Sequence, residues 1–164
     1  PFRRTEEAPT PHTPYGRLKA ETESALLAAG NAAVLRLTKA LDPALPLLAG
    51  WAAALRAGQP VRAFHDMVLA PVGLDHTAGA LLALAGARRA GVAHLSGDRD
   101  LSYHALAGAL AARLGVPAGL VAPASRRDAG IADAAAPAHT TLSMDGLSDL
   151  AGSGPVVLSR VTLC

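Results

Sequence analysis

The sequence predicts an α/β fold, and two observations support that prediction. Hydrophobic residues make up 51% of the 164 residues, which is enough apolar material for a globular domain with a sizeable core. Short apolar runs with strand character alternate with longer helical segments, at the spacing of α/β units. No internal repeat is visible, so we expect one α/β domain.

End signals place the individual elements. Thr13 is a plausible N-cap before Pro14, and Asp75 and Ser102 are the expected caps of later helices. Two prolines are expected to keep residues 38–46 irregular. The expected helices cover residues 14–29, 45–57, 75–89 and 103–115. The expected strands cover 32–37, 61–64, 67–72, 91–97 (with a turn at its end) and 119–124. The segment beyond is loop-like, and 156–163 could be a terminal strand or a disordered end.

Charge and composition argue against several function classes. Lysine and arginine total 15 against 13 acidic residues, and aromatic residues make up only 3%, so a nucleic-acid footprint is lacking. The most apolar run, residues 77–87, is too short to span a membrane, and no signal sequence opens the chain. The single cysteine, Cys164, allows no disulfide within one chain, and no Cys/His spacing indicates a metal site. We therefore expect a cytoplasmic protein without a nucleic-acid partner, membrane segment or metal.

One spacing suggests chemistry: Tyr15 is followed four residues later by Lys19, and on a helix the two share a face. A free phenol, with a pKa of about 10, is a poor proton-transfer group at neutral pH, and a nearby ammonium lowers such a pKa. Arginine outnumbers lysine 13 to 2, so chance gives such a pair only roughly 2–3% of the time. Two interpretations stay open, a catalytic pair and an exposed tyrosine beside a solvated lysine.

The sequence around this pair, EEAPTPHTPYGRLKAETE at 6–23, resembles the active-site segment of the extended short-chain dehydrogenase/reductases. In that family an acidic, proline-bearing loop leads into Tyr-x-x-x-Lys on a helix. The resemblance continues through AAVLRLTKALDP at 32–43 and through residues 51–85 and 91–115, and it covers residues 5–125. The branch it resembles is the sugar-nucleotide-binding one that includes dTDP-4-dehydrorhamnose reductase.

The resemblance implies the C-terminal part of an NAD(P)-binding Rossmann-like fold with a small substrate-binding α/β subdomain. The N-terminal Rossmann half is expected to be absent, because no G-x-G-x-x-G follows a strand. The resemblance also implies three regions: 1–37 with the Tyr-x-x-x-Lys helix and the next strand, 38–124 with the substrate-binding region and interleaved core elements, and 125–164 as an irregular tail.

The implied activity is reduction or epimerisation at a nucleotide-sugar carbonyl with NAD or NADP. Tyr15 would serve as general acid and base, and Lys19 would tune it and hold the cofactor ribose. Without the missing half we expect neither cofactor binding nor turnover. A homodimer is a further expectation.

The resemblance also places other residues at the site. Cofactor contacts are expected from Tyr15, Lys19 and Thr38, and contacts with the nucleotide sugar from Arg36, Lys39, Trp51, Phe64, Asp66 and Met67. The residues alone leave alternatives open. Arg36 lies in an apolar run and could form a structural ion pair, Thr38 and Lys39 could be loop residues exposed to solvent, Trp51 could pack in the core, and Asp66 could cap a turn.

Two other functions are compatible with the sequence. One is a non-catalytic relative that binds nucleotide or sugar nucleotide, or that regulates a partner enzyme. The other is an incomplete product whose exposed sheet edge makes it prone to aggregation.

Overall fold

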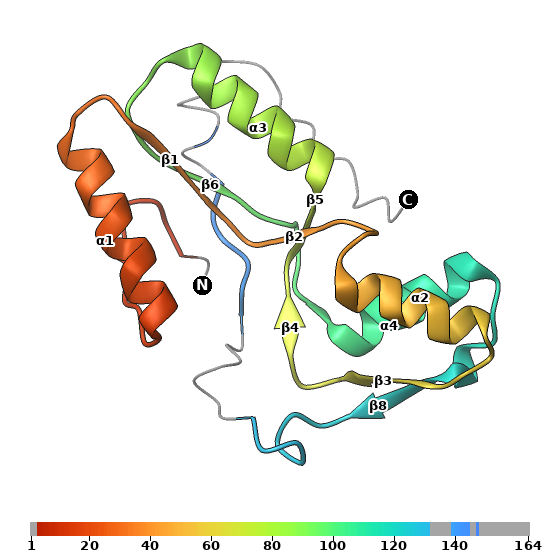
Figure 1. The fold of residues 1–164 in the computed structure, drawn as a ribbon. Coiled ribbons are helices and arrows are strands. Elements are labelled where there is room, and N and C mark those ends of the chain that lie inside the picture. Colours follow the sequence, from red (N-terminus) through yellow and green to blue (C-terminus); the bar gives the residue numbers. More distant parts are fainter. Residues whose placement is uncertain (1–2, 132–138, 145–146, 148–164) are drawn as a thin grey trace.

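The computed structural model describes residues 3–131, 139–144 and 147, and it has the α/β architecture that the sequence predicts. Figure 1 shows two groups of elements. The first contains α1 (Pro14–Ala28), β1 (Ala33–Leu37), α3 (Leu74–Ala87) and β6 (Gly91–Leu95). The second contains α2 (Pro46–Arg56), β3 (Val61–Phe64), α4 (Tyr103–Leu114) and β8 (Val121–Ala124), with the short 3₁₀ helix η1 (Ala118–Leu120) before β8. Four short strands connect the groups: β2 (Lys39–Leu41), β4 (Val68–Leu69), β5 (Pro71–Gly73) and β7 (Leu101–Ser102).

The described strands associate in pairs. Strand β1 pairs with β6, β2 with β5 and β3 with β8, all parallel, while β4 and β7 are antiparallel. Strands β1 and β2 are consecutive and are separated only by Thr38, whose backbone N–H donates to the carbonyl of Leu95 over 3.0 Å. The chain therefore leaves β6 and turns to β5 at Thr38. This residue lies at the carboxyl end of the β1–β6 pair.

The first and last helices begin and end at the predicted signals. The Thr13 hydroxyl accepts a hydrogen bond from the backbone N–H of Gly16 at 3.0 Å, and the Ser102 hydroxyl accepts one from Ala105 at 3.0 Å. Such caps satisfy N–H groups that have no partner inside the helix. Gly30 follows α1 with a φ of 77° and Gly115 follows α4 with a φ of 67°, in the left-handed region that favours glycine. The predicted N-caps at Thr13 and Ser102 are therefore confirmed.

Some local predictions are wrong. Residues 38–46 were expected to be irregular, yet Lys39–Leu41 form β2, because the prolines come after this stretch and leave its hydrogen bonds to β5 intact. Asp75 does not cap α3; Gly73 does, and Asp75 lies in the first turn, where its carboxylate favours the positive helix end. The predicted strand 67–72 is divided into β4 and β5 with different partners, and β7 was not predicted. The segment 156–163 lies outside the described residues.

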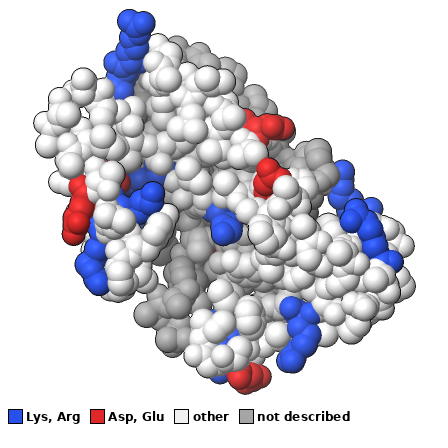
Figure 2. All heavy atoms as spheres, viewed as in Figure 1, with Lys and Arg blue, Asp and Glu red and all other residues white. Residues whose placement is uncertain are grey.

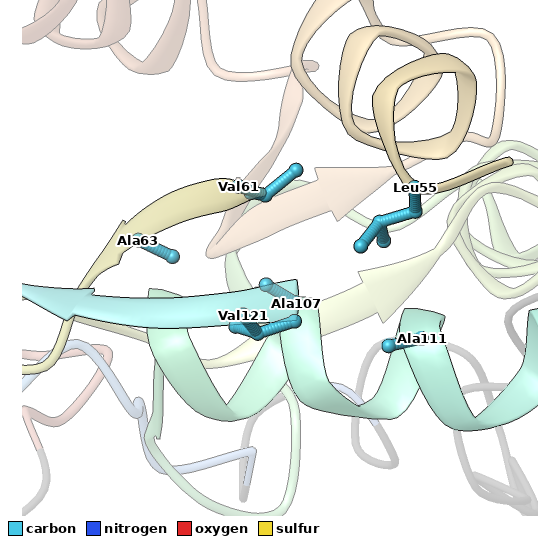
Figure 3. Close-up of a cluster of buried hydrophobic side chains, with 6 residues drawn as sticks. All are labelled: Leu55, Val61, Ala63, Ala107, Ala111 and Val121. Carbon is cyan, nitrogen blue, oxygen red and sulfur yellow. The ribbon is translucent and has the colours of Figure 1, made fainter. Parts of the chain in front are cut away.

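The second group of elements has its own apolar core (Figure 3). Leu55 from α2, Val61 from β3 and Val121 from β8 converge on α4. The α4 residues that face them are Ala107 and Ala111, each 0% exposed. Small side chains at these two positions let α4 lie close to the strands, so a larger side chain at either position would overfill the core.

A second cluster joins β6 to α3 and contains Ala80, Leu84, Ala93 and Leu95. Just after β6, a Cβ atom added at Gly97 would lie 2.5 Å from the carbonyl oxygen of Pro71. This close approach of two backbone segments requires glycine and fixes β6 against the start of β5. The first group of elements is thereby held against β5, close to Thr38, whose neighbour Lys39 pairs with Pro71.

On the face shown in Figure 2 the lysine and arginine side chains are spread over the surface, and acidic side chains lie beside several of them. Within the described residues, no helix is both long and apolar enough to cross a membrane.

Candidate functional site

Tyr15 and Lys19 lie on one face of α1, as their spacing predicts. The Lys19 Nζ lies 5.5 Å from the centroid of the Tyr15 ring, within cation–π range. Tyr15 is 69% exposed, and none of the α1 residues is buried. The structure therefore brings the pair together, and its catalytic role stays a prediction.

Arg36 holds α1 and the segment before it against β1. Its Nη2 and Nε donate to the two carboxylate oxygens of Glu23 at 2.6 and 3.1 Å, the paired geometry in which arginine binds carboxylates best. Its Nη1 donates to the carbonyls of Thr5 at 3.3 Å and Glu7 at 3.1 Å. The ion pair that the sequence left open for Arg36 is therefore present. We refer to Arg36, Glu23 and the Thr5 and Glu7 carbonyls as the Arg36 clamp.

His94 extends the Arg36 clamp into the interior. It lies opposite Arg36 in the register of β1 and β6, and it is 1% exposed. Its Nδ1 lies 2.9 Å from the carbonyl oxygen of Ser143, which can only accept, so Nδ1 carries the proton. Its Nε2 then accepts from the Arg36 Nη1 at 3.4 Å. Burial and the Arg36 charge lower the pKa of His94, against the opposing effects of the Ser143 and Arg3 carbonyls and of Glu23.

A groove of about 640 Å³ with both polar and apolar side chains in its lining opens at the carboxyl end of β1, where parallel α/β sheets place ligands. We call it the polar groove after its charged and hydroxyl-bearing lining residues. Thr38 and Lys39 border it, together with Leu69 from β4 and Tyr103 from α4. Leu37 from β1 and Val68 from β4 also line it. The remaining lining residues come from the start of the described chain and from the described segment 139–144, and they are Arg3, His139, Thr140, Thr141 and Leu142. The structure therefore brings together Thr38 and Lys39 from the predicted set.

Two features of the polar groove suggest a ligand. The Thr38 hydroxyl oxygen is buried and has no hydrogen-bond partner among the described residues, which is costly unless a ligand supplies one. The Lys39 side chain is exposed, and the described residues provide no carboxylate that pairs with it.

One rim of the polar groove is fixed by Asp100. Its carboxylate accepts from the Thr140 backbone N–H at 2.9 Å and from the Thr140 hydroxyl at 2.6 Å. Burial acts to raise the pKa of Asp100, but these hydrogen bonds outweigh it and hold the pKa below its usual value.

Other predicted residues lie elsewhere. Asp66 accepts hydrogen bonds from the Ser125 hydroxyl and the Arg126 backbone N–H, both at 2.8 Å, and so caps a turn. Burial acts to raise the pKa of Asp66, and these hydrogen bonds lower it overall. Trp51 packs against the cluster that contains Leu55 and Val61 and against a third apolar cluster, which consists of Leu41, Leu48, Leu69 and Leu106. Phe64 and Met67 are half-buried near the end of β3, and neither they nor Trp51 and Asp66 line the polar groove. Their substrate contacts stay predictions.

The sequence reasoning missed Tyr103 and Arg3. Tyr103 is one of only two tyrosines in a chain with 3% aromatic residues, and it directly follows the cap Ser102. These two signals could have identified it from the sequence. Arg3 carried no such signal. It joins the groove only because its backbone bridges to Leu142, at the far end of the described chain.

This fold recurs in solved structures of sugar-nucleotide enzymes. A dTDP-4-dehydrorhamnose reductase from Bacillus anthracis, in complex with NADP, matches with a TM-score of 0.77 and 17% identity over 89% of this chain and 52% of its own. The dTDP-glucose 4,6-dehydratase DesIV from Streptomyces venezuelae, with NAD bound, matches with a TM-score of 0.72 and 17% identity, over 91% of this chain and 48% of its own. MoeE5 in complex with UDP-glucuronic acid and NAD matches with a TM-score of 0.68 and 20% identity, over 91% of this chain and 52% of its own. The chain thus spans about half the length of these structures.

The shared fold places the chain among proteins built like the extended short-chain dehydrogenase/reductases. More specifically, the chain belongs to the RmlD substrate binding domain family, whose model matches residues 2–155. The resemblance to the sugar-nucleotide-binding branch is therefore confirmed. Comparison with curated proteins gave no match.

The residues present fit a nicotinamide cofactor only in part. Lys19 offers an ammonium group beside Tyr15, but the sequence contains no G-x-G-x-x-G motif, the pattern that holds a pyrophosphate in dinucleotide-binding folds. We therefore assign no step of a reaction to a cofactor bound by this chain alone. Among the described residues there is also no group of three or more His, Cys, Asp or Glu that could hold a metal ion.

Acid is expected to destabilise the protein through His94. Its pKa is lowered in the folded state, so below the unfolded value of about 6.5 the unfolded chain binds more protons and stability falls. The expected result is a loss of thermal stability between about pH 7.5 and 5.5 that is smaller in His94→Asn, whose amide can still donate to Ser143. An NMR titration that gives His94 a pKa at or above about 6.5 would contradict this.

Proposed function

We propose that this chain is the substrate-binding part of an oxidoreductase that acts on a nucleotide-sugar carbonyl. The observation that carries the proposal is the match of residues 2–155 to the RmlD substrate binding domain model. The polar groove supports it, because its volume falls within the roughly 300–1,000 Å³ range of small-molecule sites.

The polar groove suits a nucleotide sugar chemically. A nucleoside diphosphate is a strong anion, and Lys39 and Arg3 supply positive charge along the groove. The Thr38 hydroxyl, which lacks a partner among the described residues, can bind an oxygen of the sugar or phosphate. Lys39 is held on β2, which pairs with β5, so its backbone position is set by the sheet.

In the proposed reaction Tyr15 gives or takes the proton on the sugar oxygen, and Lys19 supports it. The nicotinamide cofactor, NAD or NADP, would supply the hydride. It requires a cofactor-binding half on the same polypeptide or on another, and the chain alone would then be inactive. A homodimer and a cytoplasmic location are also part of the proposal.

The two lysines of the chain provide a matched test of nucleotide-sugar binding. Lys39→Met is expected to weaken the binding of dTDP-glucose or UDP-glucose by about tenfold or more, because a charge-assisted hydrogen bond is lost. Lys19→Met removes the same charge from α1, outside the polar groove, and should leave the affinity unchanged. Calorimetric titration of the full chain measures both, and equal losses, or no binding to the unmodified chain, would refute this part of the proposal.

A second function is favoured by one observation: neither Tyr15 nor Lys19 lines the polar groove, and Tyr15 is largely exposed. On that basis the chain could bind nucleotide sugars without acting on them, as a regulatory or binding subunit. This candidate predicts binding without turnover.

Tyr15→Phe separates the two functions. In the complete enzyme that contains this chain, loss of general acid–base catalysis is expected to lower turnover by about 10²–10⁴-fold, while nucleotide-sugar affinity is unchanged. Turnover with NADPH or NADH and calorimetric affinity are measured on the same samples. If Tyr15→Phe turns over as fast as the unmodified enzyme, the catalytic assignment is wrong.

A further inference from the structure

His139 is the one histidine in the described lining of the polar groove, and histidine is the side chain that changes charge near neutral pH. Its Nδ1 lies 3.5 Å from the Oδ2 of Asp100, and no described residue forms a hydrogen bond with its Nε2. The His139 side chain is 76% exposed, whereas that of Asp100 is 17% exposed. One ring nitrogen therefore faces a fixed carboxylate, and the other is available to a ligand.

The segment that carries His139 is anchored at more than one point. Thr140, the next residue, donates to Asp100 through both its backbone N–H and its hydroxyl. Further along, the Leu142 backbone N–H donates at 3.0 Å to the hydroxyl of Ser96, which is 2% exposed. His139 therefore stands on a preformed rim of the polar groove, so binding does not have to order a loop first.

The charges of the polar groove favour an anion. Its described lining includes Arg3 and Lys39 and contains no aspartate or glutamate. Asp100 is not part of the lining, and it reaches the rim through its contacts with His139 and Thr140. Burial acts to raise the pKa of Asp100, but its hydrogen bonds lower that pKa overall, so Asp100 is a carboxylate at neutral pH.

The protonation state of His139 decides whether an anion can bind its Nε2. Because the Asp100 carboxylate can only accept, the Nδ1 that faces it carries a proton in the neutral and in the charged ring. In the neutral ring Nε2 is then an acceptor, which repels the oxygens of an anion. In the imidazolium Nε2 is a charged donor. Arg3 and Lys39 disfavour a further positive charge in the empty groove, and a bound anion offsets that repulsion.

We propose that His139 binds the diphosphate of the nucleotide sugar as an imidazolium held by Asp100, so that ligand binding takes up a proton from the solvent. This inference rests on the proposed nucleotide-sugar function and adds a binding residue and a pH dependence to it. In this arrangement Asp100 is the positioning residue. Because the complex contains the protonated ring, the affinity rises as the pH falls through neutrality.

The experiment is calorimetric titration of the full chain with dTDP-glucose and with UDP-glucose, in two buffers that differ in ionisation enthalpy. The difference between the buffers gives the number of protons taken up per bound ligand. A phosphate monoester has a second pKa of about 6, but these diphosphates are diesters without a proton that titrates near neutral pH, so the uptake comes from the protein. Uptake of a fraction of a proton is expected at neutral pH. The affinity is expected to rise about tenfold from about pH 8 to 6, the effect of one charge-assisted hydrogen bond.

Three variants assign the proton. His139→Gln keeps a polar side chain that cannot become charged, so it should lose the proton uptake and the rise in affinity at low pH. Asp100→Asn keeps an oxygen that can accept from Thr140 but removes the charge beside the imidazole, so it should reduce both effects. His12→Gln is the matched control, because His12 is exposed and lies outside the described lining, and it should behave like the unmodified chain.

NAD also carries a diester diphosphate and is titrated in the same way. Proton uptake with NAD but with neither nucleotide sugar would assign His139 to the cofactor and overturn the proposal, and so would uptake that persists in His139→Gln. If a nucleotide sugar binds without proton uptake, the inference fails alone and the proposed function stands. If neither nucleotide sugar binds, the inference and the proposed function fail together.

Discussion

The Arg36 guanidinium is the contact on which the position of the candidate catalytic helix depends. Helix α1 has no buried residue, so apolar burial contributes little to holding it. The Arg36 clamp supplies that hold by joining Glu23 on α1 and the Thr5 and Glu7 carbonyls to β1. The Arg36 and Glu23 side chains are 21% and 13% exposed, so the pair is largely shielded from water and salt. Tyr15 and Lys19 therefore owe their position to a polar contact one to two turns further along the same helix.

Thr38 is the second constraint, because it sets where the ligand groove lies. At Thr38 the chain ends its pairing with β6 and begins its pairing with β5. Gly97 allows the backbone after β6 to pass close to the backbone of Pro71 in β5. The same change of partner exposes Lys39 to the polar groove and leaves the Thr38 hydroxyl without a partner in the described chain. A single residue thus joins the sheet and the groove.

Local signals predicted the helices well, because caps such as Thr13 and Ser102 act within a few residues of themselves. The same signals misplaced the cap of α3 and missed β2, since a strand of three residues exists only through its partner. Thr38 and Lys39 were predicted as site residues from a strand end, which is also a local feature, and both line the polar groove. The sequence could not reveal the contribution of Arg3, which depends on pairing with a segment almost the whole chain away. It also could not decide between ion pair and site contact for Arg36, because that required the position of Glu23 in space.

The most direct test of this account is amide hydrogen exchange in α1. Arg36→Met should raise the exchange rates of α1 amides by about tenfold or more and leave those of α4 unchanged, because only α1 depends on the Arg36 clamp. Arg62→Met is the matched control, since Arg62 is exposed on β3, and it should change neither helix. Unchanged exchange in α1 after Arg36→Met would contradict the claim that this arginine positions the Tyr15 and Lys19 pair.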